Sequence, residues 1–213
     1  MKKNKDNFQQ TKDQKENKQK CGFIGLIGRP NVGKSTLLNQ LVGQKISITA
    51  KKAQTTRNRI LGIRTELNTQ IVFVDTPGIH RTEKLLNRKI VAYATETLRN
   101  TDFNLWIVEP LPESSLHKKD LSFLHIEDQG ILKLLLEKAK RTVIVLNKID
   151  TIPQGQILVC IEKLAGIADF AEIVPISALK STNVEHLLET LNLSLPSPLL
   201  YPEIGRASCR ERV

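Results

Sequence analysis

Aromatic residues, cysteines and long apolar runs are all scarce in this chain of 213 residues. Phe, Trp and Tyr make up only 4% of it, so the core must be built mainly from Ile, Leu and Val. No apolar run approaches the ~18–20 residues that cross a bilayer, and we expect no transmembrane helix. The three cysteines are an odd number without C-x-x-C spacing, which suggests neither a disulfide framework nor a zinc site. A reducing cytosol is the natural compartment, so we expect a cytoplasmic protein.

The first 20 residues lack both an apolar segment and arginine, which argues against a secretory signal and an organellar transit peptide. They hold seven lysines and three acidic residues, and we expect residues 1–20 to form a disordered Lys-rich tail. The net charge of the whole chain is +10. Such a basic excess can attract RNA or an anionic membrane, or it can simply be a solvated surface.

From residue 21 onward, short apolar runs alternate with helical patterns. Strands are predicted at residues 23–27, 59–64, 71–74, 104–108, 142–146 and 172–176, with residues 66–70 as a hairpin connection. Helices are predicted at residues 34–42, 84–100, 131–140, 157–167 and 184–191, the last with Asn183 as its N-cap. This alternation indicates an α/β fold with a mainly parallel sheet and helices on both faces.

Residues 109–129 interrupt the alternation. They include Pro110 and Pro112, and we expect them to form an exposed insertion with a short amphipathic turn near residues 121–126. His117 and His125 lie in this segment, and we interpret them as surface histidines because no third metal ligand accompanies them.

Residues 28–35 carry the pattern G-x-x-x-x-G-K-S, between an apolar run and a helical pattern. Its two glycines let backbone N–H groups approach a polyphosphate closely, and the start of the helix adds partial positive charge. Lys34 supplies a full positive charge to the terminal phosphates, and the Ser35 hydroxyl suits Mg²⁺. The phosphate-binding residues predicted here are Gly28, Arg29, Pro30, Asn31, Val32, Gly33, Lys34, Ser35 and Thr36.

Three further polar elements directly follow apolar strands, at residues 75–79, 147–150 and 177–179. Ligands of open α/β sheets bind at this carboxyl edge of the strands. Together with the phosphate loop, the elements predict a guanine-nucleotide site. The added residues are Asp75, Thr76, Pro77, Gly78 and Ile79 at the phosphates, and Asn147, Lys148, Ile149, Asp150, Ser177, Ala178 and Leu179 at guanine.

Each element has a chemical reason. The Asp75 carboxylate can hold Mg²⁺, directly or through water, and Gly78 lets a backbone N–H reach a γ-phosphate. The Asp150 carboxylate can accept hydrogen bonds from guanine N1–H and N2–H₂, while backbone N–H groups of residues 177–179 can hold guanine O6. Adenine would leave that carboxylate unpaired, which costs enough for discrimination of about 10³ or more.

These elements resemble the G1, G3, G4 and G5 boxes of translation-factor-related GTPases. Residues 45–60 and 75–80 are similar to the corresponding segments of the Era family, and the resemblance runs from about residue 22 to residue 203. It implies a P-loop NTPase (Ras-like) three-layer fold that binds GTP and GDP and hydrolyses GTP to GDP and phosphate. It further implies a switch in small ribosomal subunit (16S rRNA) maturation, with small-subunit rRNA and the 30S subunit as partners. A monomer is implied too, cytoplasmic or peripheral on the inner face of the plasma membrane.

The resemblance also implies roles for single residues. Thr56 is expected to reach Mg²⁺ in the GTP state, together with Ser35 and Asp75, and Asn31 to help hold a potassium ion. Ile79 stands where Ras-like enzymes place a water-orienting Gln, so slow intrinsic turnover is implied. The implied switch segments are residues 45–60 and 75–90, and the switch I residues are Gln54, Thr55, Thr56, Arg57 and Asn58.

The sequence departs from the family in the insertion at residues 109–129 and at its C-terminal end. Era proteins continue into a KH domain that binds the 3′ end of small-subunit rRNA. Here we expect a G domain at residues 21–195 and a linker toward the absent KH domain at residues 196–203. Residues 204–213 resemble a translated sequencing adapter, and we expect them to be a non-native scar. The alternative function is a GTP-gated signalling or membrane-associated switch that acts by protein contacts without RNA.

Overall fold

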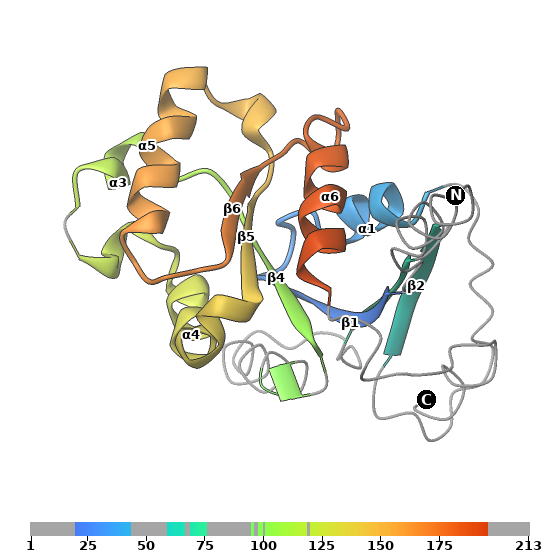
Figure 1. Ribbon diagram of the computed structural model, residues 1–213. Helices are drawn as coiled ribbons and strands as arrows, with labels where there is room; N and C mark the ends of the chain where they lie inside the picture. Colours follow the sequence, from blue (N-terminus) through green and yellow to red (C-terminus); the bar gives the residue numbers. More distant parts are fainter. Residues whose placement is uncertain are drawn as a thin grey trace, which may run out of the picture.

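The computed structural model describes residues 20–43, 59–66, 69–75, 95, 98, 99, 101–118 and 120–195. Its centre is a six-stranded sheet in the order β2-β3-β1-β4-β5-β6 (Figure 1). Only the β2–β3 pair is antiparallel, and every other neighbouring pair is parallel. The strands are β1 (Lys20–Ile27), β2 (Arg59–Glu66), β3 (Thr69–Asp75), β4 (Phe103–Val108), β5 (Thr142–Leu146) and β6 (Glu172–Pro175). The predicted α/β class with a mainly parallel sheet is confirmed.

The strands form where the sequence has short apolar runs. Every residue of β4 and β5 is buried, because strands in the middle of a parallel sheet are covered on both faces. The hairpin expected between the second and third strands is present, with Glu66 paired to Thr69.

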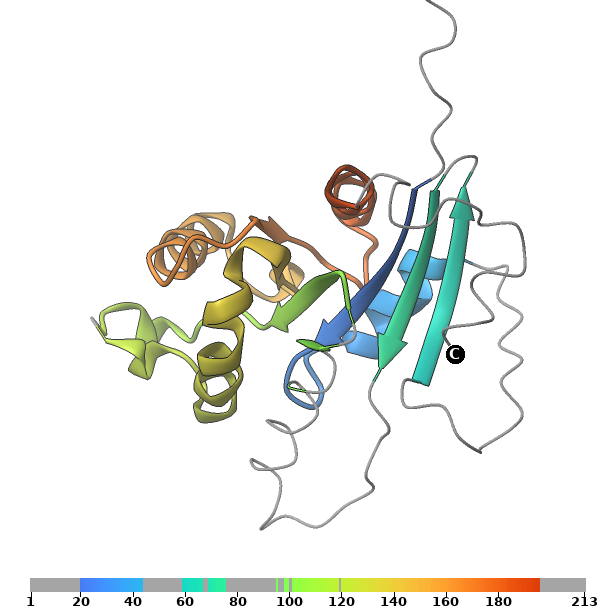
Figure 2. The ribbon, with the colours of Figure 1, turned by 60° about the horizontal axis from the view of Figure 1, so that its bottom comes forward.

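Helices cover both faces of the sheet (Figures 1 and 2). On one face α1 (Lys34–Val42) and α6 (Val184–Ser194) bury leucines against the sheet, among them Leu37, Leu41 and Leu187. On the other face α4 (Ile126–Leu135) and α5 (Gln154–Ala165) contribute Ile131, Leu132, Leu135, Cys160 and Leu164 to a second apolar cluster. The structure is therefore the three-layer arrangement that the resemblance implied.

Residues 109–129 are not the exposed insertion that we expected. They form α3 (Glu113–Leu116), the 3-10 turn η2 (Leu121–Phe123) and the first turn of α4, which begins before the predicted helix at residues 131–140. Leu111, Phe123 and Leu124 are buried in the apolar cluster beneath α4 and α5. The predicted amphipathic turn near residues 121–126 is confirmed, because Phe123 and Leu124 are buried while Leu121 and Ile126 are exposed. The expectation of an exposed segment was wrong for its apolar residues, which pack into the core. After α4, the chain continues as η3 (Leu136–Arg141).

Asn183 stands at the N-cap position of α6, as predicted, but its side chain does not cap the helix. Its amide instead donates a hydrogen bond to the Pro175 carbonyl, at 3.0 Å. The side chain therefore secures the loop between β6 and α6 rather than the helix end.

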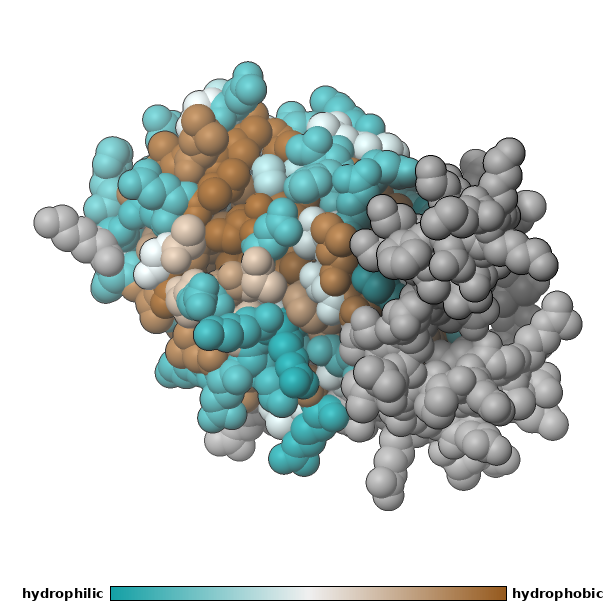
Figure 3. All heavy atoms as spheres, in the orientation of Figure 1, coloured by the Kyte–Doolittle hydropathy of each residue, from teal (hydrophilic) through white to brown (hydrophobic). Residues whose placement is uncertain are grey.

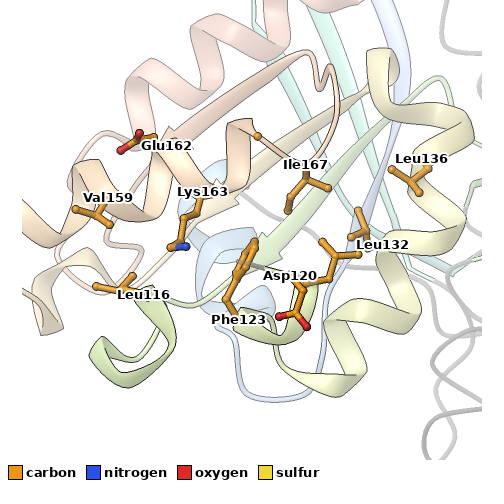
Figure 4. Close-up of a pocket in the computed structure, with 11 residues that line it drawn as sticks. Leu116, Asp120, Phe123, Leu132, Leu136, Val159, Glu162, Lys163 and Ile167 are labelled. Atoms are coloured by element: carbon orange, nitrogen blue, oxygen red, sulfur yellow. The ribbon is translucent and has the colours of Figure 1, made fainter. Parts of the chain in front are cut away.

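Apolar side chains also gather on the surface over α5 (Figure 3). Beside them is a hollow of about 690 Å³ lined by α3, η2, α4 and α5, with Phe123, Leu132 and Ile167 among its walls (Figure 4). Lys163 Nζ donates to the Lys118 carbonyl at 2.8 Å and lies 5.2 Å from the centre of the Phe123 ring. No predicted nucleotide-site residue lines this hollow. Within the described part of the chain, no helix is both long and apolar enough to cross a membrane.

Candidate nucleotide-binding site

Three of the four predicted elements meet at one edge of the sheet. Residues 28–33 follow β1, and residues 177–179 follow β6. Residues 147–150 follow β5 and run into the 3-10 turn η4 (Ile149–Thr151). Because these strands are parallel, their carboxyl ends lie at the same edge, and hydrogen bonds between the loops hold them together.

The phosphate loop is shaped by two close approaches. A Cβ atom at position 28 would lie 2.6 Å from the Ile107 carbonyl oxygen, so only glycine fits there. Lys34 Nζ donates hydrogen bonds to the carbonyls of Gly28 and Arg29, each at 2.7 Å, and so draws the loop around its ammonium group. Ser35 and Thr36 follow, exposed in the first turn of α1. This gives a cationic side chain and a hydroxyl at a helix N-terminus, which suits a polyphosphate and Mg²⁺.

Asn147 joins all three loops. Its Nδ2 donates to the Val32 carbonyl at 2.8 Å, and its Oδ1 accepts from the Ala178 N–H at 2.9 Å. The residue is only 2% exposed. A Cβ atom at Gly33 would lie 2.3 Å from Asn147 Nδ2, and Gly33 also has a φ of 98°, a left-handed conformation that favours glycine. The second glycine of the loop is thus required by the asparagine of the guanine element.

A neighbouring hydroxyl group stabilises the charged form of the Asp150 carboxylate, the form that accepts hydrogen bonds. The Ser177 hydroxyl donates to Asp150 Oδ1 at 2.6 Å and itself accepts from the Lys180 N–H at 3.1 Å. Chiefly through the Ser177 bond, the pKa of Asp150 is held below its ordinary value. A charged carboxylate at this position suits the N1–H and N2–H₂ donors of guanine.

Two of the backbone N–H groups predicted to hold guanine O6 have partners within the chain, and their role at the base stays a prediction. The Ser177 N–H donates to the Thr182 carbonyl at 3.2 Å, and that of Ala178 is donated to Asn147. Leu179, the third residue of this element, is 76% exposed.

Lys148 ties the guanine element to the phosphate loop a second time. Its backbone is left-handed, with a φ of 64°, and its Nζ donates to the Asn31 carbonyl at 2.8 Å. Asn31 is left-handed too, with a φ of 65°. Lys148 also forms an ion pair with Glu109, the residue that follows β4.

Two acidic residues of this region were missed by the sequence analysis. Glu109 forms ion pairs with both Lys148 and Arg29, and Arg29 Nε donates to Asp128 Oδ2 at 3.2 Å. Asp128 is 4% exposed, and burial raises the pKa of its carboxyl. A signal for Glu109 was available, because it directly follows the apolar run at residues 104–108.

Several predicted residues lie outside the described part of the chain. These are the switch I residues 54–58, including Thr56, and residues 76–79 after β3. Nearly all of the predicted helix at residues 84–100, residues 1–19 of the predicted tail, and the predicted linker and scar at 196–213 also lie outside the described residues. The backbone of Asp75 ends β3, but its side chain is outside the description. Ser35 is therefore the one predicted Mg²⁺ ligand whose side chain can be placed. Within the described ranges, no group of three or more His, Cys, Asp or Glu residues could hold a metal ion.

The sheet order and the joined loops define a P-loop nucleotide-binding domain. Residues 23–148 match the family described as 50S ribosome-binding GTPase, and the chain belongs to this family.

Within the family, the chain is similar to Era, as the sequence resemblance predicted. The GTPase Era of Syntrophus aciditrophicus (strain SB) is 45% identical over 185 residues, which are 86% of this chain and 57% of that relative. The chain thus spans little more than half of that relative's length.

Two solved structures of Era are also similar. The crystal structure of Era in complex with MgGDPNP and nucleotides 1506–1542 of 16S ribosomal RNA has a TM-score of 0.62 and 36% identity, over 84% of this chain and 58% of that one. A variant of Aquifex aeolicus Era bound to GDP·AlF4⁻ has a TM-score of 0.61 and 35% identity, over 83% of this chain and 57% of that one.

Proposed function

We propose that this chain binds GTP at the joined loops and hydrolyses it to GDP and phosphate. The observation that carries the proposal is the pair of bonds made by Asn147, to Val32 in the phosphate loop and to Ala178 beside Asp150. This pair holds the phosphate-binding and base-reading groups at a fixed spacing. Lys34 stabilises the phosphates, Asp150 selects guanine, and water attacks the γ-phosphate without a covalent intermediate on the protein.

We propose Mg²⁺ as the resident metal ion. The exposed Ser35 hydroxyl is a hard oxygen donor beside Lys34, which fits Mg²⁺. Thr56 and Asp75 are the further ligands expected from the resemblance. Bound Mg²⁺ supplies positive charge against the phosphate oxygens. We also propose that the Asn31 side chain helps to hold a potassium ion near the phosphates, as the resemblance implies.

We propose that the protein acts as a GTP-dependent switch in maturation of the small ribosomal subunit. Support comes from the similarity to Era, one structure of which holds nucleotides of 16S ribosomal RNA. The proposed partners are small-subunit rRNA and the 30S subunit. We propose a monomer in the cytoplasm that associates peripherally with the inner face of the plasma membrane, which its basic charge would favour.

Calorimetry with GTP and Mg²⁺ tests the proposed nucleotide site. Lys34→Ala removes the cation at the phosphates and should weaken GTP binding by about 2–5 kcal/mol. Lys133→Ala, at an exposed position on α4, is the matched control and should bind GTP like the unmodified chain. Equal affinity in Lys34→Ala would contradict the phosphate-site assignment. Phosphate release measured in KCl and in NaCl tests the potassium ion with the same proteins.

A further inference from the structure

Glu109 lies between the two halves of the site. It follows β4, the strand between β1 and β5, and so emerges between the phosphate loop and the guanine loop. Its Oε2 contacts Arg29 Nη2 and its Oε1 contacts Lys148 Nζ. One carboxylate therefore bridges a cation of each loop.

The surroundings make the Arg29 end of this bridge stronger than an ordinary surface ion pair, whereas the Lys148 side chain at the other end is 38% exposed. The side chains of Glu109 and Arg29 are only 22% and 21% exposed, so water and salt screen their attraction less. Arg29 is also anchored from α4, because Asp128 accepts a hydrogen bond from its Nε and has a side chain that is 6% exposed. Arg29 is thus held by two carboxylates, and Lys148 is held by the Glu109 carboxylate and the Asn31 carbonyl.

We infer that Glu109 is a positioning residue for nucleotide binding, holding the phosphate loop and the guanine loop in register through Arg29 and Lys148. The inference rests on the proposed function. Without the bridge, the nucleotide itself must bring the two loops into register, and the ordering cost appears as weaker binding. Loss of contacts that hold a bound ligand in place shows mainly in its dissociation rate.

Whether removal of the Glu109 charge weakens or strengthens nucleotide binding separates a positioning role from a simple charge effect. Glu109 carries a negative charge close to a phosphate site, so its removal through space alone would attract an anionic nucleotide more strongly. Positioning predicts the opposite, namely weaker binding. High salt suppresses the through-space effect and leaves the positioning effect.

The test is the dissociation rate of a fluorescent GDP analogue, chased with excess GDP, at ~0.1 M and ~0.5 M salt. We expect dissociation from Glu109→Gln to be about tenfold faster than from the unmodified chain at both salt concentrations. Glu109→Asp keeps the charge but is one methylene shorter, so it should give an intermediate rate. Glu113→Gln, at an exposed position in α3, should leave the rate unchanged. The melting temperature of each nucleotide-free protein is measured alongside.

Each outcome bears on the inference. Slower or equal dissociation from Glu109→Gln, when the unmodified chain binds the analogue, overturns the inference alone. If Glu109→Gln melts at a lower temperature but releases the analogue at an unchanged rate, Glu109 stabilises only the fold. That result also overturns the inference. If Glu109→Gln does not fold, Glu109→Asp carries the test, because its shorter side chain weakens the same bridge; it should still release the analogue faster than the unmodified chain, and an unchanged rate overturns the inference. An unmodified chain that binds no guanine nucleotide overturns the proposed function, and this inference with it.

Discussion

Several side chains of this site donate hydrogen bonds to backbone carbonyls of the loops. These bonds hold the loops in shape before a nucleotide binds. Lys34 holds the carbonyls of Gly28 and Arg29, and Asn147 holds Val32. Ser177 acts differently, because its hydroxyl donates to the Asp150 carboxylate. A group arranged in advance costs less to order upon binding, so the Ser177 bond to Asp150 should favour guanine binding.

The Ser177 bond should be visible in the titration of Asp150. In the folded chain the pKa of Asp150 is lowered, first of all by the Ser177 hydroxyl. Such a bond stabilises the fold above the pKa of the unfolded chain, and this contribution is lost as the pH falls through the folded pKa. Ser177→Ala should therefore raise the pKa of Asp150 toward its ordinary value, as measured by NMR titration of the carboxyl carbon.

Ser122→Ala is the matched control for that titration. Ser122 makes the corresponding bond to Asp120 and lowers its pKa. This variant should move the titration of Asp120 and leave that of Asp150 in place. An Asp150 midpoint that is the same in Ser177→Ala and in the unmodified chain would show that the hydroxyl does not stabilise the charged carboxylate.

At the scale of elements, strands were predictable and packed irregular segments were not. The runs that became β4 and β5 are apolar at nearly every position, a pattern typical of buried parallel strands. Residues 109–129 mix single apolar residues with charged ones; their pattern indicates an amphipathic turn near residues 121–126 but does not show how deeply Leu111, Phe123 and Leu124 are buried. They belong to the same apolar cluster as residues of α4, which begins within this segment, and of α5, which lies further along the chain.

The loops of the site could be predicted from the sequence, but the contacts between them could not. Its loops could be found because each joins a strand end to a polar motif with known chemistry. Glu109 could have been found in the same way, as a polar residue at a strand end, but its bridge to Arg29 and Lys148 could not, because the bridge depends on which strand lies between β1 and β5. The use of the Ala178 N–H by Asn147 depends on the three-dimensional path of both loops in the same way.

At the scale of the whole molecule, charge and composition indicate which parts of an RNA the 213-residue chain can contact. Base reading in RNA commonly uses aromatic stacking and loop surfaces. Aromatic residues are 4% of this chain, and the net charge is +10. We therefore expect these residues by themselves to contact phosphates more than bases.

A salt titration checks this expectation. Binding to a fluorescent 3′-end segment of 16S rRNA should be weak, equal to that of a scrambled RNA, and steeply lowered by salt. The log–log slope should be about −0.7 per phosphate neutralised on a single strand. Tight, salt-resistant preference for the true sequence would mean that these 213 residues read RNA bases themselves.

The central claim, a site that selects guanine through Asp150, is tested most directly by exchanging the base. Asp150→Asn presents an amide N–H₂ that pairs with the C2 oxygen of xanthine, while its carbonyl accepts from N1–H. The measurement is competition of GTP and XTP for the unmodified chain, Asp150→Asn and the exposed control Asp169→Asn. We predict that the unmodified chain and Asp169→Asn prefer GTP, by about 10³, and that Asp150→Asn prefers XTP. Undiminished GTP preference in Asp150→Asn would contradict the account.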